Sequence, residues 1–268
     1  HLAEHGIEVR HHLPGVGQNL QDHYQARIVF RCTRPITLNE VAHSLWRKAS
    51  AGLEWALFRT GPLTVGAGVV ALFWRTRPEL ATPDVEFHVI PFSADRPGEP
   101  LHPFPGFTVS TCQLRPESRG RLELRSADPA DAPKIFPNYL ATETDRRTMV
   151  DGLELIRRIA AQPALRPYVA EEHLPGPACR SREDLLAYVR EKGTTIFHPT
   201  STCSMGPASD PMAVVDPRLR VHGLEGLRVA DASIMPTVVS GNTNAACIMI
   251  GERCADFIRA DRRSRAAA

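Results

Sequence analysis

Two short polar segments near the C-terminal end contain the residue types that acid–base chemistry would use. The first, FHPTSTCSMG at 197–206, places His198 beside a proline in a loop that follows a predicted helix. The second, SGNTN at 240–244, comes directly before the last predicted helix. Histidine takes up a proton near neutral pH, and a helix N-terminus stabilises negative charge. A base and a helix N-terminus could together support a hydride transfer, although a histidine with a purely structural role could occur in the same sequence context.

Two glycine patterns invite comparison with nucleotide-binding loops. GVG at 15–17 lacks the third glycine of such a loop. GAGVVA at 66–71 does fit G-x-G-x-x-A, and Glu86 follows at a distance suited to a ribose contact. That motif should turn a strand into a helix, whereas residues 69–74 are typical of a strand. We therefore expect a turn into a strand, with a nicotinamide-dependent enzyme as the alternative.

Composition excludes several classes of function. The net charge of +2 is small and the basic residues are mixed with acids, so nucleic acid is not an expected partner. No apolar run approaches the roughly 20 residues of a membrane span, so we predict no transmembrane segment. The histidines and cysteines show no second ligand cluster at a fixed spacing, so no metal site is predicted. We expect a cytoplasmic protein, with peripheral contact to the inner membrane as the alternative.

Hydrophobic periodicity and turn residues predict an α+β fold. Strands are predicted at 27–31, 69–74, 85–90, 107–114, 121–125, 218–221 and 227–230. Helices are predicted at 39–59, 142–161, 181–193 and 243–259. The gaps between the central strands have the length of hairpin connections, which favours an antiparallel sheet with one covered face.

Longer matching segments then identify a family. In order along the chain they are LPGVGQNLQDH at 13–23, GPLT at 61–64, SRGRLELRSADP at 118–129, PKIFPNYL at 133–140, FHPTSTCSMG at 197–206 and VVDPRLRVHGLEGLRVADASIMPTVVSGNTNA at 214–245. Over nearly its whole length the chain resembles the C-terminal half of the glucose–methanol–choline (GMC) oxidoreductases, most closely their choline-dehydrogenase-like branch.

The resemblance implies a division of the chain. Residues 26–190 would form an antiparallel-sheet substrate-binding domain with helices. Residues 1–25 and 191–268 would be segments of an α/β FAD-binding domain, with the catalytic residues in the second of them. The glycine-rich N-terminal Rossmann part of that domain would precede His1 and is absent from this chain.

The resemblance also implies roles for single residues. The family's catalytic base matches His198, and its second active-site residue matches Asn242. Asn19 and Asp22 are expected to hold loop structure rather than to touch substrate. Thr200 and Ser201 stand where many relatives have a small residue and glycine. The positions expected to contact FAD are Ile196, Asp231, Ala232, Asn242 and Thr243.

The implied reaction is oxidation of a primary alcohol, choline-like or aliphatic, by hydride transfer to the flavin while His198 accepts the hydroxyl proton. Oxygen or a quinone-type carrier would then accept the electrons. A non-catalytic binding module is the remaining alternative. Because most of the FAD platform would lie upstream, we expect this chain alone to be inactive and to bind FAD weakly or not at all. We also expect its apolar residues Val229, Ile234, Ile248 and Ile250 to be partly exposed or poorly supported.

Overall fold

A computed structural model of the chain describes residues 1–66, 68–96 and 98–266. The chain divides into two compact units, which we describe separately. Unit 1 consists of residues 1–23, 114–145 and 195–268, and unit 2 consists of residues 24–113 and 146–194. Residues 114–145, placed by the sequence with the substrate-binding domain, thus group with the terminal segments. The functions assigned to these segments stay predictions.

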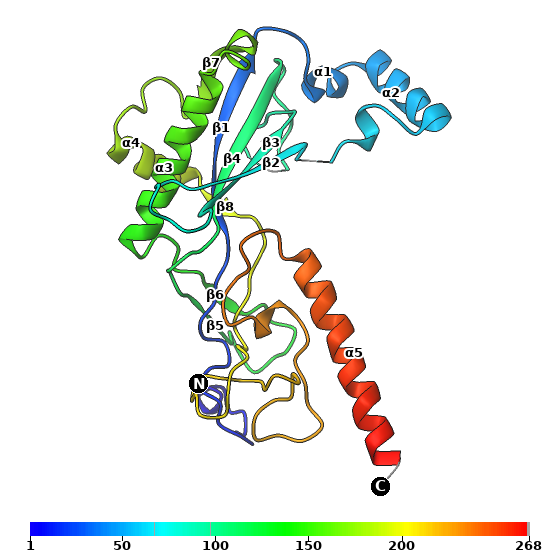
Figure 1. Ribbon diagram of the computed structural model, residues 1–268, viewed down its shortest axis with the longest axis vertical. Coiled ribbons are helices and arrows are strands. Elements are labelled where there is room, and N and C mark those ends of the chain that lie inside the picture. The colour runs from blue at the N-terminus through cyan, green and yellow to red at the C-terminus, as the bar shows by residue number, and fades with distance from the viewer. Residues whose placement is uncertain (67, 97, 267–268) are drawn as a thin grey trace. The chain divides into compact units, whose positions relative to one another are not determined.

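The centre of unit 2 is an antiparallel sheet (Figure 1). Its main strands lie in the order β2-β3-β4-β1-β7, and the two-residue β8 pairs with β1. Their bounds are β1 Tyr24–Cys32, β2 Val70–Trp74, β3 Val85–Ile90, β4 Gly106–Gln113, β7 Val169–Leu174 and β8 Thr194–Thr195. The antiparallel sheet predicted from the sequence is confirmed.

The glycine pattern at 66–71 leads into this sheet. Ala67 lies outside the described residues, and the segment after it enters β2, which pairs antiparallel with β3. Glu86 is buried on β3, opposite Phe73 and Cys112. A dinucleotide fold would instead require a helix after the glycines and a parallel sheet. The expected strand after the glycines is therefore confirmed, and the nicotinamide alternative loses its structural basis.

Two helices pack on the sheet of unit 2 (Figure 1). Helix α3 spans Glu143–Ala160, and α4 spans Arg182–Lys192. Met149, Leu153 and Ile156 of α3 are buried, and a Cβ at Gly152 would lie 2.4 Å from Oγ1 of Thr111. Glycine thus lets α3 approach β4 closely. Helix α4 begins with a capping box between Ser181 and Asp184 and buries Leu185 and Val189.

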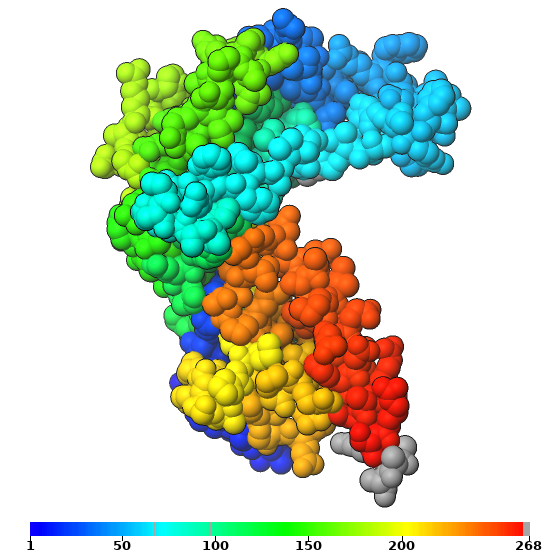
Figure 2. Space-filling view, viewed as in Figure 1, coloured from blue at the N-terminus to red at the C-terminus, as the bar shows by residue number. Residues whose placement is uncertain are grey.

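The single helix predicted at 39–59 consists of two, α1 at Leu38–Ala42 and α2 at Leu45–Phe58. Ser44 has extended backbone angles and its hydroxyl accepts a hydrogen bond from the N–H of Arg47, so it caps a new helix. Leu45 and Trp46 are more than four-fifths exposed. Figure 2 shows α2, in the blue-to-cyan shades of its residues, on the surface of unit 2. Two 3-10 turns complete unit 2, η2 at Pro62–Thr64 and η3 at Arg166–Tyr168.

Unit 1 has little regular structure apart from one long helix. It contains the turns η1 (Ala3–His5) and η4 (Ala232–Ile234), the hairpin of β5 (Arg121–Glu123) and β6 (Lys134–Phe136), and helix α5 (Asn244–Ala266). The strands predicted at 218–221 and 227–230 are reduced to isolated bridges, such as that between Arg220 and Arg228. Among the described residues of unit 1, loops therefore supply most of the packing.

One apolar cluster holds these loops to α5. Its buried members are Val214, Val215, Leu219, Val221, Ile234, Met235, Ile250 and Cys254. The expectation that Ile234 and Ile250 would be partly exposed is therefore wrong, because the 214–235 loops cover them. Val229 is half-buried against the same cluster, and Ile248 is exposed as expected.

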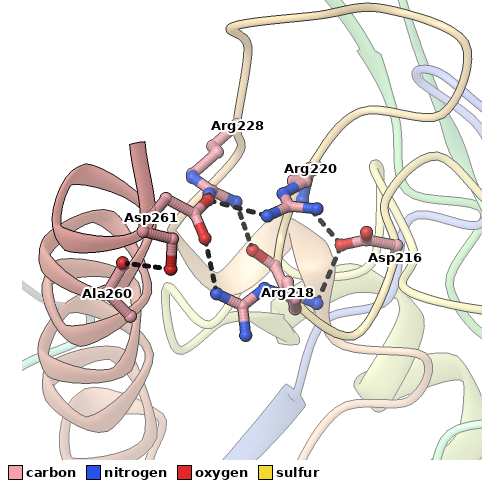
Figure 3. A network of polar contacts seen from close by, with 7 residues as sticks. Asp216, Arg218, Arg220, Arg228, Ala260 and Asp261 are labelled. Atoms are coloured by element: carbon pink, nitrogen blue, oxygen red, sulfur yellow. Dashed lines mark hydrogen bonds and ion pairs between the residues drawn. The ribbon is translucent and has the colours of Figure 1, made fainter. Parts of the chain in front are cut away.

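A charged network holds the other end of α5 (Figure 3). The carboxylate of Asp261 accepts hydrogen bonds from Arg218 and Arg220, each at 2.7 Å, and from Arg228. The loop itself is held by Asp216, whose Oδ1 accepts from the backbone N–H groups of Arg218 and Arg220. One carboxylate thus joins the helix to two neighbouring loop segments. Among the described residues, no helix is long and apolar enough to cross a membrane.

We predict that Asp261→Asn lowers the free energy of unfolding at pH 7. Hydrogen bonds from Arg220 and then Arg218 lower the pKa of Asp261 to about 2. An unfolded aspartate titrates near about 3.9, so this stabilisation is complete above that pH and is lost as the pH falls through about 2. Urea unfolding should give a lower midpoint for the variant at pH 7 and a shrinking difference between pH 4 and pH 2.

Asp256→Asn is the matched control for this prediction. Asp256 lies on the same helix, is exposed, and pairs with Arg259 at 3.3 Å and Arg253 at 3.9 Å. Exposed pairs of this kind contribute about 0–1 kcal/mol. Equal midpoints for the Asp261 variant and the unsubstituted protein at pH 7 would show that the network does not stabilise α5.

Candidate active site

His198 lies in a loop whose backbone is fixed by the segment at 21–23. Its N–H donates to Oδ1 of Asp22 at 2.9 Å, and the N–H of Ile196 donates to the carbonyl of His23 at 3.1 Å. Phe197 between them has a φ of 64° and is exposed. Because this left-handed conformation is unfavourable for a bulky residue, the flanking hydrogen bonds must hold the turn.

The carboxylate of Asp22 accepts several of the hydrogen bonds that hold the His198 loop. Besides the His198 N–H, its buried carboxylate accepts from the hydroxyl groups of Tyr139 and Thr195. Thr195 also accepts from the N–H of Phe197 at 2.7 Å. The expectation that Asp22 holds loop structure agrees with these contacts. The loop that it holds is the one containing the candidate base.

His23 contacts the ring of His198 directly. Nδ1 of His23 lies 2.9 Å from Nδ1 of His198, and Nε2 of His23 lies 3.3 Å from the carbonyl oxygen of Leu114. A carbonyl can only accept, so Nε2 of His23 carries the proton and its Nδ1 is the acceptor. The proton between the rings therefore belongs to Nδ1 of His198. In neutral His198 this leaves Nε2 as the basic nitrogen.

Gln21 connects the 21–23 segment to residues 236–238, which precede the second candidate segment at 240–244. Its side-chain amide donates to the carbonyl of Pro236 at 3.2 Å, and its Oε1 accepts from the N–H of Val238 at 3.1 Å. Its backbone exchanges two hydrogen bonds with Thr200, at 3.1 and 2.8 Å. Asn19 adds bonds to Ser204 and Pro236, as expected of a residue that holds loop structure. Three consecutive residues thus hold the stretch 196–200 and the stretch 236–238.

The segment after His198 runs beside η4. The N–H groups of Ser201, Cys203 and Met205 donate to the carbonyls of Ala232, Ser233 and Ile234 at 2.8–3.2 Å. Ser201 is fully buried with a φ of 77°, a conformation that favours glycine. This agrees with its place at a position where many GMC relatives have glycine. Its hydroxyl lies 2.9 Å from that of Thr200, so serine gains a buried partner in return.

The predicted cofactor positions lie along the same two stretches. Asp231 is exposed and caps η4, accepting from the N–H of Ser233 at 2.8 Å, and Ala232 is half-buried within that turn. Thr243 is buried directly before α5, and Asn242 is exposed beside it. Ile196 is half-buried in the His198 loop. Convergence of Asn242 with His198 on one substrate oxygen stays a prediction.

Cys203, in the same loop, is not an alternative nucleophile. Burial raises the pKa of its thiol above the ordinary value, so the group is protonated at neutral pH. A thiol is a much weaker nucleophile than a thiolate. His198 therefore remains the candidate acid–base group of this loop.

Sequence reasoning missed His23 and Gln21. Both lie in LQDH at the end of the 13–23 segment, in which only Asn19 and Asp22 were predicted to hold loop structure. His23 is fully buried and Gln21 nearly so, although both side chains are polar. Buried polar groups require partners. A histidine at the end of a family motif was the available signal, but its partner is 175 residues away.

Comparison with known proteins defines the class. A sequence model of the family described as GMC oxidoreductase matches residues 116–251, and the chain belongs to that family. Mitochondrial choline dehydrogenase of Homo sapiens is 46% identical over 258 residues, which is 96% of this chain. Oxygen-dependent choline dehydrogenase of Brucella ovis is 42% identical over 96% of this chain. The resemblance inferred from the motifs is confirmed.

Solved structures agree with the fold. A structure of formate oxidase from Aspergillus oryzae matches 98% of this chain with a TM-score of 0.89 and 26% sequence identity. The chain spans about half the length of these relatives, with 43% of the human protein, 47% of the Brucella protein and 50% of the formate oxidase covered.

We predict that Asp22→Asn destabilises the protein by about 1–3 kcal/mol, the usual effect of leaving a buried polar group unsatisfied. The carboxylate accepts from three donors. An amide would turn an N–H group toward at least one of them. Urea unfolding measures the change, and Asp128→Asn serves as the control because Asp128 is exposed and its carboxylate accepts from the N–H of Ala130. Equal losses in both variants would contradict the central role of Asp22.

Proposed function

We propose that the full-length protein containing this chain is an FAD-dependent oxidoreductase that oxidises the CH–OH group of a primary alcohol, choline-like or aliphatic. Similarity to choline dehydrogenases at 42–46% identity supports the reaction class. The observation that carries the proposal is the His23–His198 pair, since its hydrogen-bond pattern leaves Nε2 of His198 as a base. A histidine with a purely structural role would not need a second imidazole that fixes its tautomer.

His198 would accept the hydroxyl proton of the alcohol at Nε2. Alcohols are far weaker acids than imidazolium, which titrates near about 6.5, so the proton cannot be removed in a separate equilibrium step. It must move as the C–H bond is broken, while the His198 ring is held in place. As His198 becomes cationic, its Nδ1–H still donates to His23. The Asp22 carboxylate, which accepts from the backbone N–H of His198, would keep the loop in place as the charge develops.

The residues near the start of α5 fit an FAD ring. A bound FAD would accept the hydride and gain negative charge. Helix α5 begins at Asn244, and the N–H groups of its first turn have no partner within the helix, so they favour an anion at that end. Asn242 would orient the alcohol oxygen together with His198. Asp231, exposed on η4, Thr243, Ala232 and Ile196 would hold the cofactor.

The remaining assignments follow from the same proposal. The electron acceptor would be oxygen or a quinone-type carrier, and the protein would be cytoplasmic or peripheral to the inner membrane. A non-catalytic binding module would need no histidine pair of fixed tautomer. Its expected behaviour, a full-length protein without bound flavin and without alcohol-dependent flavin bleaching, distinguishes it from the enzyme.

We predict that His198→Ala in the full-length flavoprotein lowers kcat by ~10²–10⁴, the usual effect of losing a general base. Flavin absorbance should be unchanged. Stopped-flow bleaching of the flavin by choline or a long-chain primary alcohol measures the step directly. His12→Ala removes an exposed histidine outside the site and should retain full activity. Normal bleaching by the His198 variant would remove the basis of the proposed mechanism.

A second prediction tests the positioning role of His23. His23→Leu should lower kcat roughly tenfold or more, about 1.4 kcal/mol, with KM little changed, because Nδ1 of His198 loses its acceptor. His23→Asn should recover most of the activity, since its amide oxygen can accept the same N–H. Equal activity of the two variants would show that His23 only fills space.

A further inference from the structure

Three side chains with metal-binding groups lie close together in unit 2. Asp95 follows β3, His102 precedes β4, and His173 lies in β7. One ligand atom of each lies within 4.8 Å of the other two. The sequence predicts no metal site because His173 is far along the chain from Asp95 and His102, and the three follow no fixed ligand spacing. The fold brings them together.

A β-bulge places His173. In the pairing of β7 with β1, Leu174 opposes Val29 and Glu172 opposes Phe30, so His173 is an extra residue without a partner in the register. Bulges of this kind redirect a side chain. The carboxylate of Glu172 binds Arg157 of α3, whereas the ring of His173 lies 4.9 Å from that of His102. The bulge thus separates a structural ion pair from the imidazole cluster.

Asn39 holds the loop that carries Asp95 and His102. Its fully buried amide donates to the carbonyls of Ser93 and His102 at 3.1 and 2.8 Å, and its Oδ1 accepts from the N–H of Ser93 at 2.9 Å. The N–H of His102 donates to the carbonyl of Ser93, which closes the loop. Two of the three ligand residues therefore belong to one loop whose ends are fixed by a single side chain.

His102 has the hydrogen-bond partners of a metal ligand. Its Nδ1 lies 3.0 Å from Oγ of the buried Ser93, and its Nε2 lies 3.1 Å from Oδ1 of Asp95. Ligating histidines typically donate their other ring N–H to an oxygen, which fixes the tautomer. Without a metal, Nε2–H of His102 can donate to the Asp95 carboxylate. With a metal bound, the proton would move to Nδ1 and donate to Ser93, and the lone pair of Nε2 would face the same point as the Asp95 carboxylate. The ring of Phe104 stacks on the ring of His102, with 4.6 Å between the ring centroids, and so holds the orientation of the imidazole.

We propose that Asp95, His102 and His173 bind one divalent transition-metal ion, with Zn²⁺ the best match. Two imidazoles and a carboxylate suit Zn²⁺ and leave a fourth position for water. Ligand atoms of a tetrahedral zinc site lie roughly 3.3 Å apart, given metal–ligand distances of about 2.0–2.2 Å. The Asp95–His102 pair already has that spacing, and the exposed Asp95 side chain can adjust toward His173. The ion would tie β7 to the loop before β4.

The test uses the untagged full-length protein, stripped of metal with a chelator. Titration with ZnCl₂ should show one tight equivalent, and Co²⁺ in its place should give the visible absorption bands of a four-coordinate site. His173→Gln and Asp95→Asn should abolish the Co²⁺ bands and weaken Zn²⁺ binding at least tenfold. Zn²⁺ should raise the melting temperature of the unsubstituted protein and leave that of both variants unchanged.

A double variant, His11→Ala with His12→Ala, is the matched control, since these adjacent exposed histidines are the sort that capture stray metal. It should retain the Co²⁺ bands. Absence of tight binding in the unsubstituted protein, bands that persist in His173→Gln, or bands that vanish in the control would each overturn the proposal. Both test substitutions avoid the buried His102, and flavin content checks that the variants are folded.

Discussion

The hydrogen bonds of Gln21, Asp22 and His23 are the constraint on which unit 1 depends. Gln21 holds 236–238, Asp22 holds the backbone of His198, and His23 holds its ring. Each partner is 175 to 217 residues away in sequence. A set of loops with few strands has many conformations of similar energy, and buried polar contacts with no alternative partner select one of them. The position of the His198 backbone and ring therefore depends on this one segment.

The second support of the site is helix α5, held by two different kinds of interaction. Apolar residues near its start, such as Ile250, pack under the 214–235 loops. Near its end, Asp261 forms ion pairs with three arginines from those same loops. The first interaction weakens when apolar surface is lost and the second when the carboxylate is protonated. The orientation of the helix start, where Asn242 and Thr243 lie, is thus fixed by contacts far along the helix.

Local sequence signals predicted much of the fold. Strands such as 85–90 and the capping box at Ser181 were recognisable because β-branched runs and cap residues act over a few positions. The break at Ser44 was missed because a long helix and two short ones share one periodicity. The candidate base His198 was found through family motifs. His23 and the Asp95–His102–His173 cluster could not be found, since their meaning lies in long-range contacts.

The division into units also orders assembly on the ribosome. Unit 2 is complete once residue 194 has emerged, whereas unit 1 combines residues 1–23 with a segment that ends at 268. Residues 1–23 can pair early with the 114–145 segment, as Leu20 does with Gly120, but their contacts with residues 196–238 form only after that later segment has been synthesised. Non-local contacts of this kind form slowly and leave intermediates that are prone to aggregate. A premature stop shortly before α5 would therefore leave a well-formed sheet in unit 2 and an incompletely folded unit 1, whose buried polar groups would lack partners.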